Sequence, residues 1–267
     1  MSHVKVSKVW KRFGTQPVLE NINLDVAAGS YVSIVGPSGC GKSTFLRLLL
    51  SQEQPSEGNI LLDGAAISPE PSQERGVVFQ RYSVFPHLNV QENVALGLEF
   101  AQAPLLGKLF GRKKRVVLEE CRHYLDSVGL DAARDKYPSE LSGGMQQRLA
   151  IAQALIKKPK VLLLDEPFGA LDPGIRADIH QLMLRLWRET GMTVFMVTHD
   201  LREAFHLGNR IIVFDRHRTR EEELPYYGAT ITMDLKLNDN DPLKARAMEH
   251  YQNQNKDSFA LPELQAG

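Results

Sequence analysis

The chain has 267 residues, of which 43% are hydrophobic and 24% are charged, and its 32 basic residues balance 32 acidic ones. The composition is that of a globular protein with a buried core, and zero net charge argues against a protein that coats nucleic acid, which needs a basic surface. The two cysteines, Cys40 and Cys121, belong to no CxxC pair or His/Cys cluster, which argues against a disulfide framework and a zinc site.

Strands are predicted in the first third of the chain, where apolar residues alternate with polar ones or form short runs, at 4–10, 18–26, 31–35, 58–62 and 76–80. Ala28 and Gly29 mark a turn before the third of these strands. That strand runs into a glycine-rich loop, and a helix is predicted directly after it at 44–50.

The middle of the chain is predicted to be helical from about residue 89 to residue 136, with apolar residues at helical spacing in 116–128. Helices predicted at 142–157, 175–190 and 201–207 then alternate with strands at 161–164, 193–197 and, as the final strand, 211–214. The wholly apolar strand 161–164 is typical of a strand buried on both faces of a parallel sheet. Alternating strands and helices predict an α/β fold with right-handed crossovers, interrupted by a helical subdomain.

Contact with a membrane is expected only through a partner protein. The N-terminal residues 1–10 lack the apolar centre of a signal peptide. The longest apolar runs, such as 161–164, are far too short to span a bilayer. We therefore expect a soluble protein.

A phosphate-binding loop is predicted at residues 36–43, which match the pattern G-x-x-x-x-G-K-[ST] between an apolar strand and a helix. Glycines let the backbone curl so that its N–H groups point at phosphate oxygens, and the following helix adds its positive end. Lys42 can reach the β- and γ-phosphates, and Ser43 offers a hydroxyl to Mg²⁺. We read Cys40 as a small filler residue. The predicted nucleotide-binding positions are Gly36, Pro37, Ser38, Gly39, Cys40, Gly41, Lys42, Ser43 and Thr44.

Two carboxylates, Asp165 and Glu166, follow the buried strand 161–164. Ligand sites of parallel sheets lie at the carboxyl ends of the strands. Asp165 can hold Mg²⁺, and Glu166 can orient or deprotonate an attacking water molecule. The alternative is an acidic turn before Pro167, which the phosphate-binding loop in the same chain makes the weaker interpretation.

Residues 141–148, Leu-Ser-Gly-Gly-Met-Gln-Gln-Arg, resemble the signature of the nucleotide-binding subunits of ABC transporters. In that family the loop binds the γ-phosphate of ATP held by the opposite subunit. The chemistry is consistent, because Ser142 can cap a helix while Gly143 and Gly144 expose N–H groups at its positive end. Met145 replaces the commoner glutamine, a variant that we associate with importers of the nitrate, sulfonate and taurine type.

Other residues match the family in the expected order. Gln80 resembles the Q-loop glutamine, which contacts Mg²⁺ and senses the transmembrane partner. Asp172 resembles the D-loop residue at the dimer interface, and His199 resembles the switch histidine that contacts the γ-phosphate. Phe13 stands where the family stacks an aromatic side chain on adenine. Standing alone, His199 would be read as a structural histidine and Phe13 as a surface aromatic.

The resemblance covers about residues 3–215 and implies a P-loop NTPase core with an N-terminal antiparallel β subdomain and an inserted α-helical subdomain. The expected division is a RecA-like core at 1–88 and 158–225, a signature subdomain at 89–157 and a C-terminal tail at 226–267. It also implies an ATPase that binds ATP and Mg²⁺, with Glu166, His199 and Gln80 as catalytic residues and Ser43, Gln80 and Asp165 as metal ligands.

The expected assembly is a head-to-tail dimer, of this chain with itself or with a close paralogue, with ATP between the subunits. It is expected to bind membrane permease subunits and to be served by an extracytoplasmic solute-binding protein. Its expected place is the cytoplasmic face of the inner membrane. An exporter subunit and a non-transport ABC ATPase remain the alternatives. The segment 101–115 is longer than usual and ends in four basic residues. It is either a solvated loop or a contact with the permease or with anionic lipid.

Overall fold

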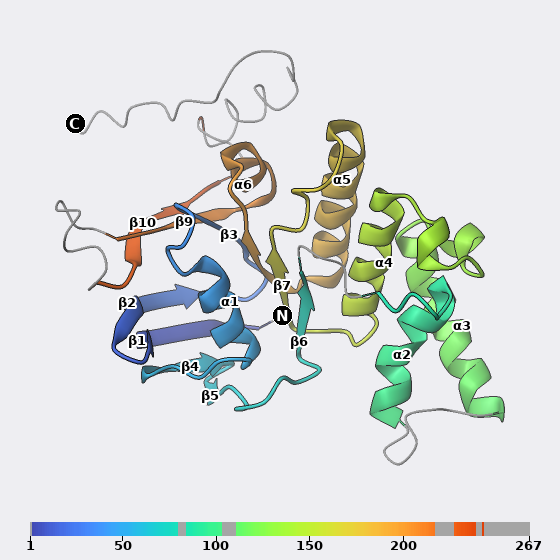
Figure 1. The fold of residues 1–267 in the computed structure, drawn as a ribbon, viewed down its shortest axis with the longest axis horizontal. Helices are drawn as coiled ribbons and strands as arrows, with labels where there is room; N and C mark the ends of the chain where they lie inside the picture. The colour runs from blue at the N-terminus through green and yellow to red at the C-terminus, as the bar shows by residue number, and fades with distance from the viewer. Residues whose placement is uncertain (1, 80–83, 103–110, 217–226, 239–241, 243–267) are drawn as a thin grey trace.

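The α/β fold predicted from the sequence is confirmed in a computed structural model of the chain, which describes residues 2–79, 84–102, 111–216, 227–238 and 242 (Figure 1). The larger sheet has the strand order β10 (Thr230–Lys236), β9 (Arg210–Asp215), β3 (Tyr31–Val35), β8 (Thr193–Val197), β7 (Val161–Asp165) and β6 (Arg75–Val78). The strands from β9 to β6 run parallel, and β10 pairs antiparallel with β9.

A smaller antiparallel sheet has the order β2 (Gln16–Val26), β1 (Val4–Phe13), β4 (Glu57–Leu62) and β5 (Ala65–Ala66). The helices are α1 (Lys42–Leu50), α2 (Val90–Gln102), α3 (Gly111–Ser127), α4 (Gly143–Leu155), α5 (Pro173–Thr190) and α6 (Leu201–Leu207), with short 3-10 turns at Asp131–Ala133 and Pro138–Glu140. No helix among the described residues has both the length and the apolar character needed to cross a bilayer.

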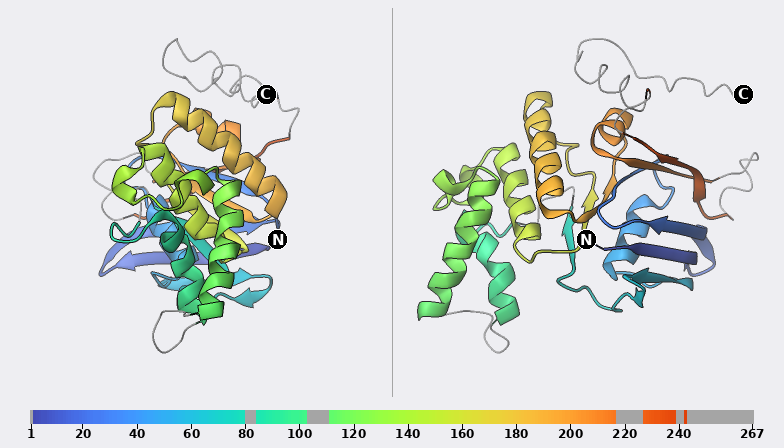
Figure 2. Two further views of the ribbon diagram at one scale, coloured as in Figure 1. Left: turned by 90° about the vertical axis from the view of Figure 1, so that its right-hand side faces the viewer. Right: turned by 180° about the vertical axis from the view of Figure 1, so that it is seen from behind.

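The two faces of the larger sheet are covered by different elements, which explains why its central strands are apolar throughout. In β7, Leu162 and Leu164 pack with α4 and α5 on one face. Val161 and Leu163 pack on the other face with α1 and the smaller sheet. Every residue of β8 is buried in the same two-sided way. The views from three sides show α1 between the sheets and α2 and α3 at the far end of the molecule (Figure 2).

The C-terminal part of the larger sheet differs from the prediction. The strand predicted at 211–214 as the last one is β9, and β10 follows it as an edge strand. Arg210 of β9 fixes β10 through two hydrogen bonds to Asp234, at 2.8 and 2.6 Å. The edge strand therefore belongs to the core sheet, although it lies in the segment expected as a tail.

Candidate active site

The loop after β3 is closely packed at both of its ends. A Cβ atom on Gly36, whose φ is +147°, would lie 2.1 Å from the carbonyl oxygen of Phe214. A Cβ atom on Gly41, whose φ is +92°, would lie 2.8 Å from the Leu19 side chain. Both positions require glycine for space as well as for backbone conformation. Between them, Pro37, Ser38 and Gly39 form the exposed tip of the loop.

The side chain of Lys42 lies inside this loop and is almost buried. Its ammonium group donates hydrogen bonds to the carbonyl oxygens of Gly36, at 2.7 Å, and Pro37, at 2.8 Å. The Cys40 thiol is buried beside it, and this burial raises the pKa of the thiol. An uncharged, enclosed thiol agrees with the interpretation of Cys40 as a filler residue.

Oxygen ligands suitable for a divalent cation meet where α1 begins and β7 ends. The Ser43 hydroxyl donates to Oδ1 of Asp165 at 3.0 Å. Burial raises the pKa of the Asp165 carboxyl, the Ser43 hydrogen bond opposes this, and the charge of Glu166 raises it further. A half-buried carboxylate that is costly to ionise next to a hydroxyl suits a hard cation such as Mg²⁺, which would offset the negative charge.

Glu166 has an uncommon backbone conformation, with φ of +47°. A non-glycine residue in the left-handed region costs on the order of 1–3 kcal/mol and is found most often at functional sites. The backbone N–H of Glu166 donates to the carbonyl oxygen of Val197 at 3.0 Å, which ties the end of β7 to β8. Its Oε2 atom lies 3.6 Å from Nδ1 of His199. The bend thus turns the carboxylate towards His199.

The signature residues lie on a different part of the molecule, at the start of α4. Ser142 is the N-cap of α4, and its hydroxyl accepts a hydrogen bond from the N–H of Met145 at 3.4 Å. Ser142 and Gly143 are exposed, whereas Gly144 packs against Ile175 of α5, where a Cβ atom would approach to 2.4 Å. Strands β6 and β7 lie between α1 and α4 in the views of Figures 1 and 2.

The remaining predicted residues are less closely joined to this site. Thr44 lies in α1, and Asp172 is the N-cap of α5 without a side-chain capping bond. Phe13 ends β1, is 45% exposed and has the Lys11 ammonium group 4.8 Å from its ring centroid. Gln80 lies outside the described residues, so its predicted contact with Mg²⁺ stays a prediction, as do the roles given to the other site residues.

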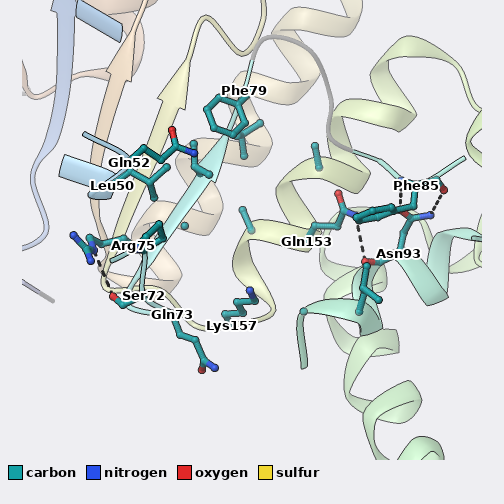
Figure 3. A pocket seen from close by; sticks show the side chains of 18 residues that line it. Leu50, Gln52, Ser72, Gln73, Arg75, Phe79, Phe85, Asn93, Gln153 and Lys157 are labelled. Atoms are coloured by element: carbon teal, nitrogen blue, oxygen red, sulfur yellow. Dashed lines mark hydrogen bonds between the residues drawn. The ribbon is translucent and has the colours of Figure 1, made fainter. Parts of the chain in front are cut away.

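A groove of about 490 Å³ lies between β6 and the helices α2 and α4 (Figure 3). Phe79 lines the side of the core, and Phe85, 42% exposed, lines the side of the helices. The buried Asn93 side chain makes two hydrogen bonds with the backbone of Phe85. Its Oδ1 atom accepts from the Phe85 N–H at 2.8 Å, and its Nδ2 atom donates to the Phe85 carbonyl oxygen at 3.0 Å. Gln153 of α4 donates to Oδ1 of Asn93 at 3.1 Å. The wall of the groove is therefore connected to the helix that begins with the signature.

Sequence reasoning missed several side chains that support the site, among them Asn93, Gln153, Arg176 and Glu203. Asn93 and Glu203 are polar residues that are at least 95% buried. A polar residue on the apolar side of a helix is a weak signal in a single sequence, since it identifies no partner. Their contacts join residues of separate helices, and the sequence alone does not show which helices pack together.

Comparison with known proteins gives a consistent result. Residues 19–169 match the family described as ABC transporter. The aliphatic sulfonates import ATP-binding protein SsuB of Bacillus anthracis is 41% identical over 228 residues, which covers 83% of this chain and 86% of the relative. The nitrate import ATP-binding protein NrtC of Synechococcus elongatus is 44% identical over 200 residues, which covers 75% of this chain and 29% of the relative.

Among solved structures, a dimeric ATP-binding cassette in a post-hydrolysis state, bound to ADP and phosphate, is 34% identical to this chain. The TM-score is 0.68, and the match covers 88% of this chain and 99% of the solved one. Because the match covers most of both chains, it concerns the architecture as a whole rather than the phosphate-binding loop alone.

Proposed function

The chain belongs to the ABC transporter family, and from this premise we propose that its site hydrolyses ATP between two copies of the subunit. The chain is the ATP-binding and ATP-hydrolysing motor subunit of an importer. Its relatives include sulfonate, nitrate and sulfate/thiosulfate import ATP-binding proteins, which supports import over the exporter and non-transport alternatives.

The observation that carries the catalytic proposal is the arrangement of four side chains around the ends of β7 and β8. Ser43 and Asp165 are 3.0 Å apart, and Glu166 and His199 are 3.6 Å apart. Glu166 takes the proton of the water molecule that attacks the γ-phosphorus, so that ADP and inorganic phosphate are the products. His199 contacts the γ-phosphate and holds it in place for this attack.

The oxygen atoms of Ser43 and Asp165 are suitable ligands for Mg²⁺. Ser43 and Asp165 would hold the ion, with Gln80 as a further oxygen ligand. When bound, the ion offsets the negative charge of the β- and γ-phosphates. Lys42 binds the same phosphates by exchanging its contacts with two carbonyl oxygens of the loop for phosphate oxygens.

A second copy of the chain completes the site, because Ser142 and Gly143 are exposed and lie away from the phosphate-binding loop of their own subunit. The helix end of α4 offers N–H groups to the γ-phosphate of ATP held by the partner. ATP favours the closed dimer because it contacts both subunits, and hydrolysis removes those contacts.

The groove beside β6 is the proposed docking place for a short helix of the membrane permease (Figure 3). It borders Phe79, which directly precedes Gln80, and Gln153 of the signature helix. A helix seated there contacts both the nucleotide side and the signature side of the subunit, which couples dimer closure to alternating access. The complete importer includes an extracytoplasmic solute-binding protein, and the subunit lies on the cytoplasmic face of the inner membrane.

The experiment that tests the catalytic proposal is the Glu166→Gln substitution. Turnover is expected to fall by about 10²–10⁴, because the base for water is lost, while ATP binding persists. Steady-state ATPase assays and size-exclusion chromatography with Mg-ATP measure turnover and the population of ATP-bound dimers, which should accumulate. Glu189→Gln, an exposed position at the end of α5, is the matched control. Near-normal turnover of Glu166→Gln contradicts the role of Glu166.

A further inference from the structure

A buried carboxylate on α6 holds the loop that carries His199. The Glu203 side chain is 5% exposed, and its Oε2 atom accepts a hydrogen bond from the hydroxyl of Thr198 at 2.7 Å. The same hydroxyl oxygen accepts from the N–H of Asp200 at 3.0 Å. Thr198 and Asp200 flank His199, whose own side chain is 68% exposed. Packing therefore does not fix the His199 ring, and the backbone of its neighbours decides where it lies.

One arginine on α5 contacts this loop and the D-loop together. Nη2 of Arg176 donates to the carbonyl oxygen of Leu171 at 3.1 Å, next to Asp172. Its Nη1 atom lies 3.7 Å from Oδ2 of Asp200, and its Nε atom lies 3.7 Å from Oε1 of Glu203. The guanidinium group thus lies between the segment that leads into α5, to which it is hydrogen-bonded, and the carboxylates of Asp200 and Glu203, each at 3.7 Å.

The segment that follows Glu166 reaches the same carboxylate by another route. Nε2 of His180, a residue fully buried in α5, lies 3.5 Å from Oε1 of Glu203. The His180 ring packs edge-on against Phe168, with 4.6 Å between the centroids. Phe168 comes two residues after Glu166. Glu203 is therefore linked to both segments that carry the proposed catalytic side chains, directly to the loop of His199 and through His180 to the segment after Glu166.

We propose that Arg176 and Glu203 are positioning residues that couple the D-loop to His199. When a second subunit contacts the D-loop at Asp172, the Arg176 connection to Asp200 and Glu203 sets the backbone beside His199, so that hydrolysis begins only in the closed dimer. Buried charges are retained at a cost in desolvation, which is offset here by mutual pairing and hydrogen bonds. The inference rests on the proposed function, because it uses the closed dimer and the role of His199.

The first test is Arg176→Met in the full chain, which keeps an unbranched apolar stem and removes the guanidinium contacts with Leu171, Asp200 and Glu203. The kcat of the isolated subunit with Mg-ATP is expected to fall about ten-fold with KM for ATP nearly unchanged, because the loss acts on the transition state rather than on ATP binding. When added to Glu166→Gln, the substitution should still permit ATP-bound dimers. An unchanged kcat overturns the proposal, and so does a fall in kcat that matches a fall in the number of ATP molecules bound per subunit.

The matched control is Arg202→Met. Arg202 contacts the same Asp200, with 3.3 Å between Nε and Oδ1, yet none of its described contacts involves the D-loop or Glu203. Its kcat should therefore remain close to that of the wild type. An equal loss in Arg202→Met and Arg176→Met means that only the charge balance of Asp200 matters, which overturns the coupling.

Glu203→Gln supplies a second and milder test, since the amide oxygen still accepts from Thr198 while the charge facing Arg176 is lost. Its kcat should fall with KM unchanged, and the double variant with Arg176→Met should be no slower than the slower single variant. Independent, multiplying losses contradict a shared connection. Failure of the proposed function is distinguishable, because it appears as absent Mg-ATP turnover in the wild type itself.

Discussion

The phosphate-binding loop and the signature loop both precede a helix, α1 or α4, but the chain surrounds them differently. At the first loop, Gly36 and Gly41 are enclosed by Phe214 and by β2, and Lys42 is 7% exposed. At the second loop, Ser142 is exposed and a Cβ atom on Gly143 would have its nearest neighbour only at 4.0 Å. One subunit therefore builds a complete cradle for phosphate, whereas the signature presents an open surface.

The two loops have similar local chemistry, but under the proposed function they serve two separate steps, ATP binding by one subunit and closure with a partner. Both helix ends offer N–H groups, and neither helix has an acidic residue in its first turn to compete with an anion. The enclosed loop is organised before ATP arrives, so changes there should alter affinity in a single subunit. Under the proposed function the open loop receives its ligand from a partner, so changes there should alter closure and turnover.

Of changes within these two loops, the larger effect is expected from Lys42→Ala. The affinity of the isolated subunit for ATP should fall about 100-fold, because charge-assisted hydrogen bonds to phosphate contribute up to about 3 kcal/mol. Isothermal titration calorimetry with Mg-ATP measures the affinity. Lys158→Ala, an exposed lysine paired with Glu120 far along the chain, is the control and should bind normally. Unchanged affinity in Lys42→Ala removes the distinction between the enclosed and the open loop.

A smaller effect of the opposite kind is expected from Ser142→Arg. Because this side chain is exposed and, under the proposed function, contacts the partner, ATP affinity of the single subunit should be retained while turnover falls about ten-fold, equivalent to about 1.4 kcal/mol of lost contact in the closed dimer. Size-exclusion chromatography in the Glu166→Gln background measures closure. A variant that forms ATP-bound dimers as readily as Glu166→Gln alone contradicts the shared site.

The sequence was sufficient for those parts of the fold in which local pattern and burial coincide. The apolar runs of β7 and β8 arise because both faces are covered, and Gly36, Gly41 and Gly144 of the two motifs stand where a Cβ atom would clash. The edge strand β10 carried a signal, since Ile231, Met233 and Leu235 alternate with polar residues, but it lay in a segment read as a tail.

Contacts between distant residues could not be predicted in the same way. Glu203 and Thr198 are five residues apart, yet the Arg176 connection depends on how α5 packs against α6. The left-handed conformation of Glu166 depends on the hydrogen bond of its N–H to β8. Neither feature has a counterpart in residue spacing, because tertiary packing determines both.

The last effect concerns vesicle binding by the basic start of α3, at the tip of the helical subdomain where α2 ends (Figure 1). Residues 103–110 of the longer segment 101–115 lie outside the description, but α3 itself begins with Gly111 and the four basic residues. Positive charges at the positive end of a helix destabilise it, by about 0.3–1 kcal/mol each at an exposed site. An anionic surface near these basic residues would offset their unfavourable interaction with the helix end. The same tip is connected to the proposed docking groove, because Leu96 and Gly97 of α2 line that groove.

Replacing the exposed pair Arg112 and Arg115 by Gln tests whether this tip faces lipid. Sedimentation with vesicles of phosphatidylcholine and phosphatidylglycerol should show about 30-fold weaker binding in low salt, since each of the two basic residues near an anionic surface contributes about 1 kcal/mol before screening. The melting temperature should rise slightly, because the helix loses two unfavourable charges. The control replaces Arg185 and Arg188 of α5, which are also exposed and carry the same charge. Equal vesicle binding by the two double variants would show that net charge alone matters and that the basic start of α3 is a solvated surface.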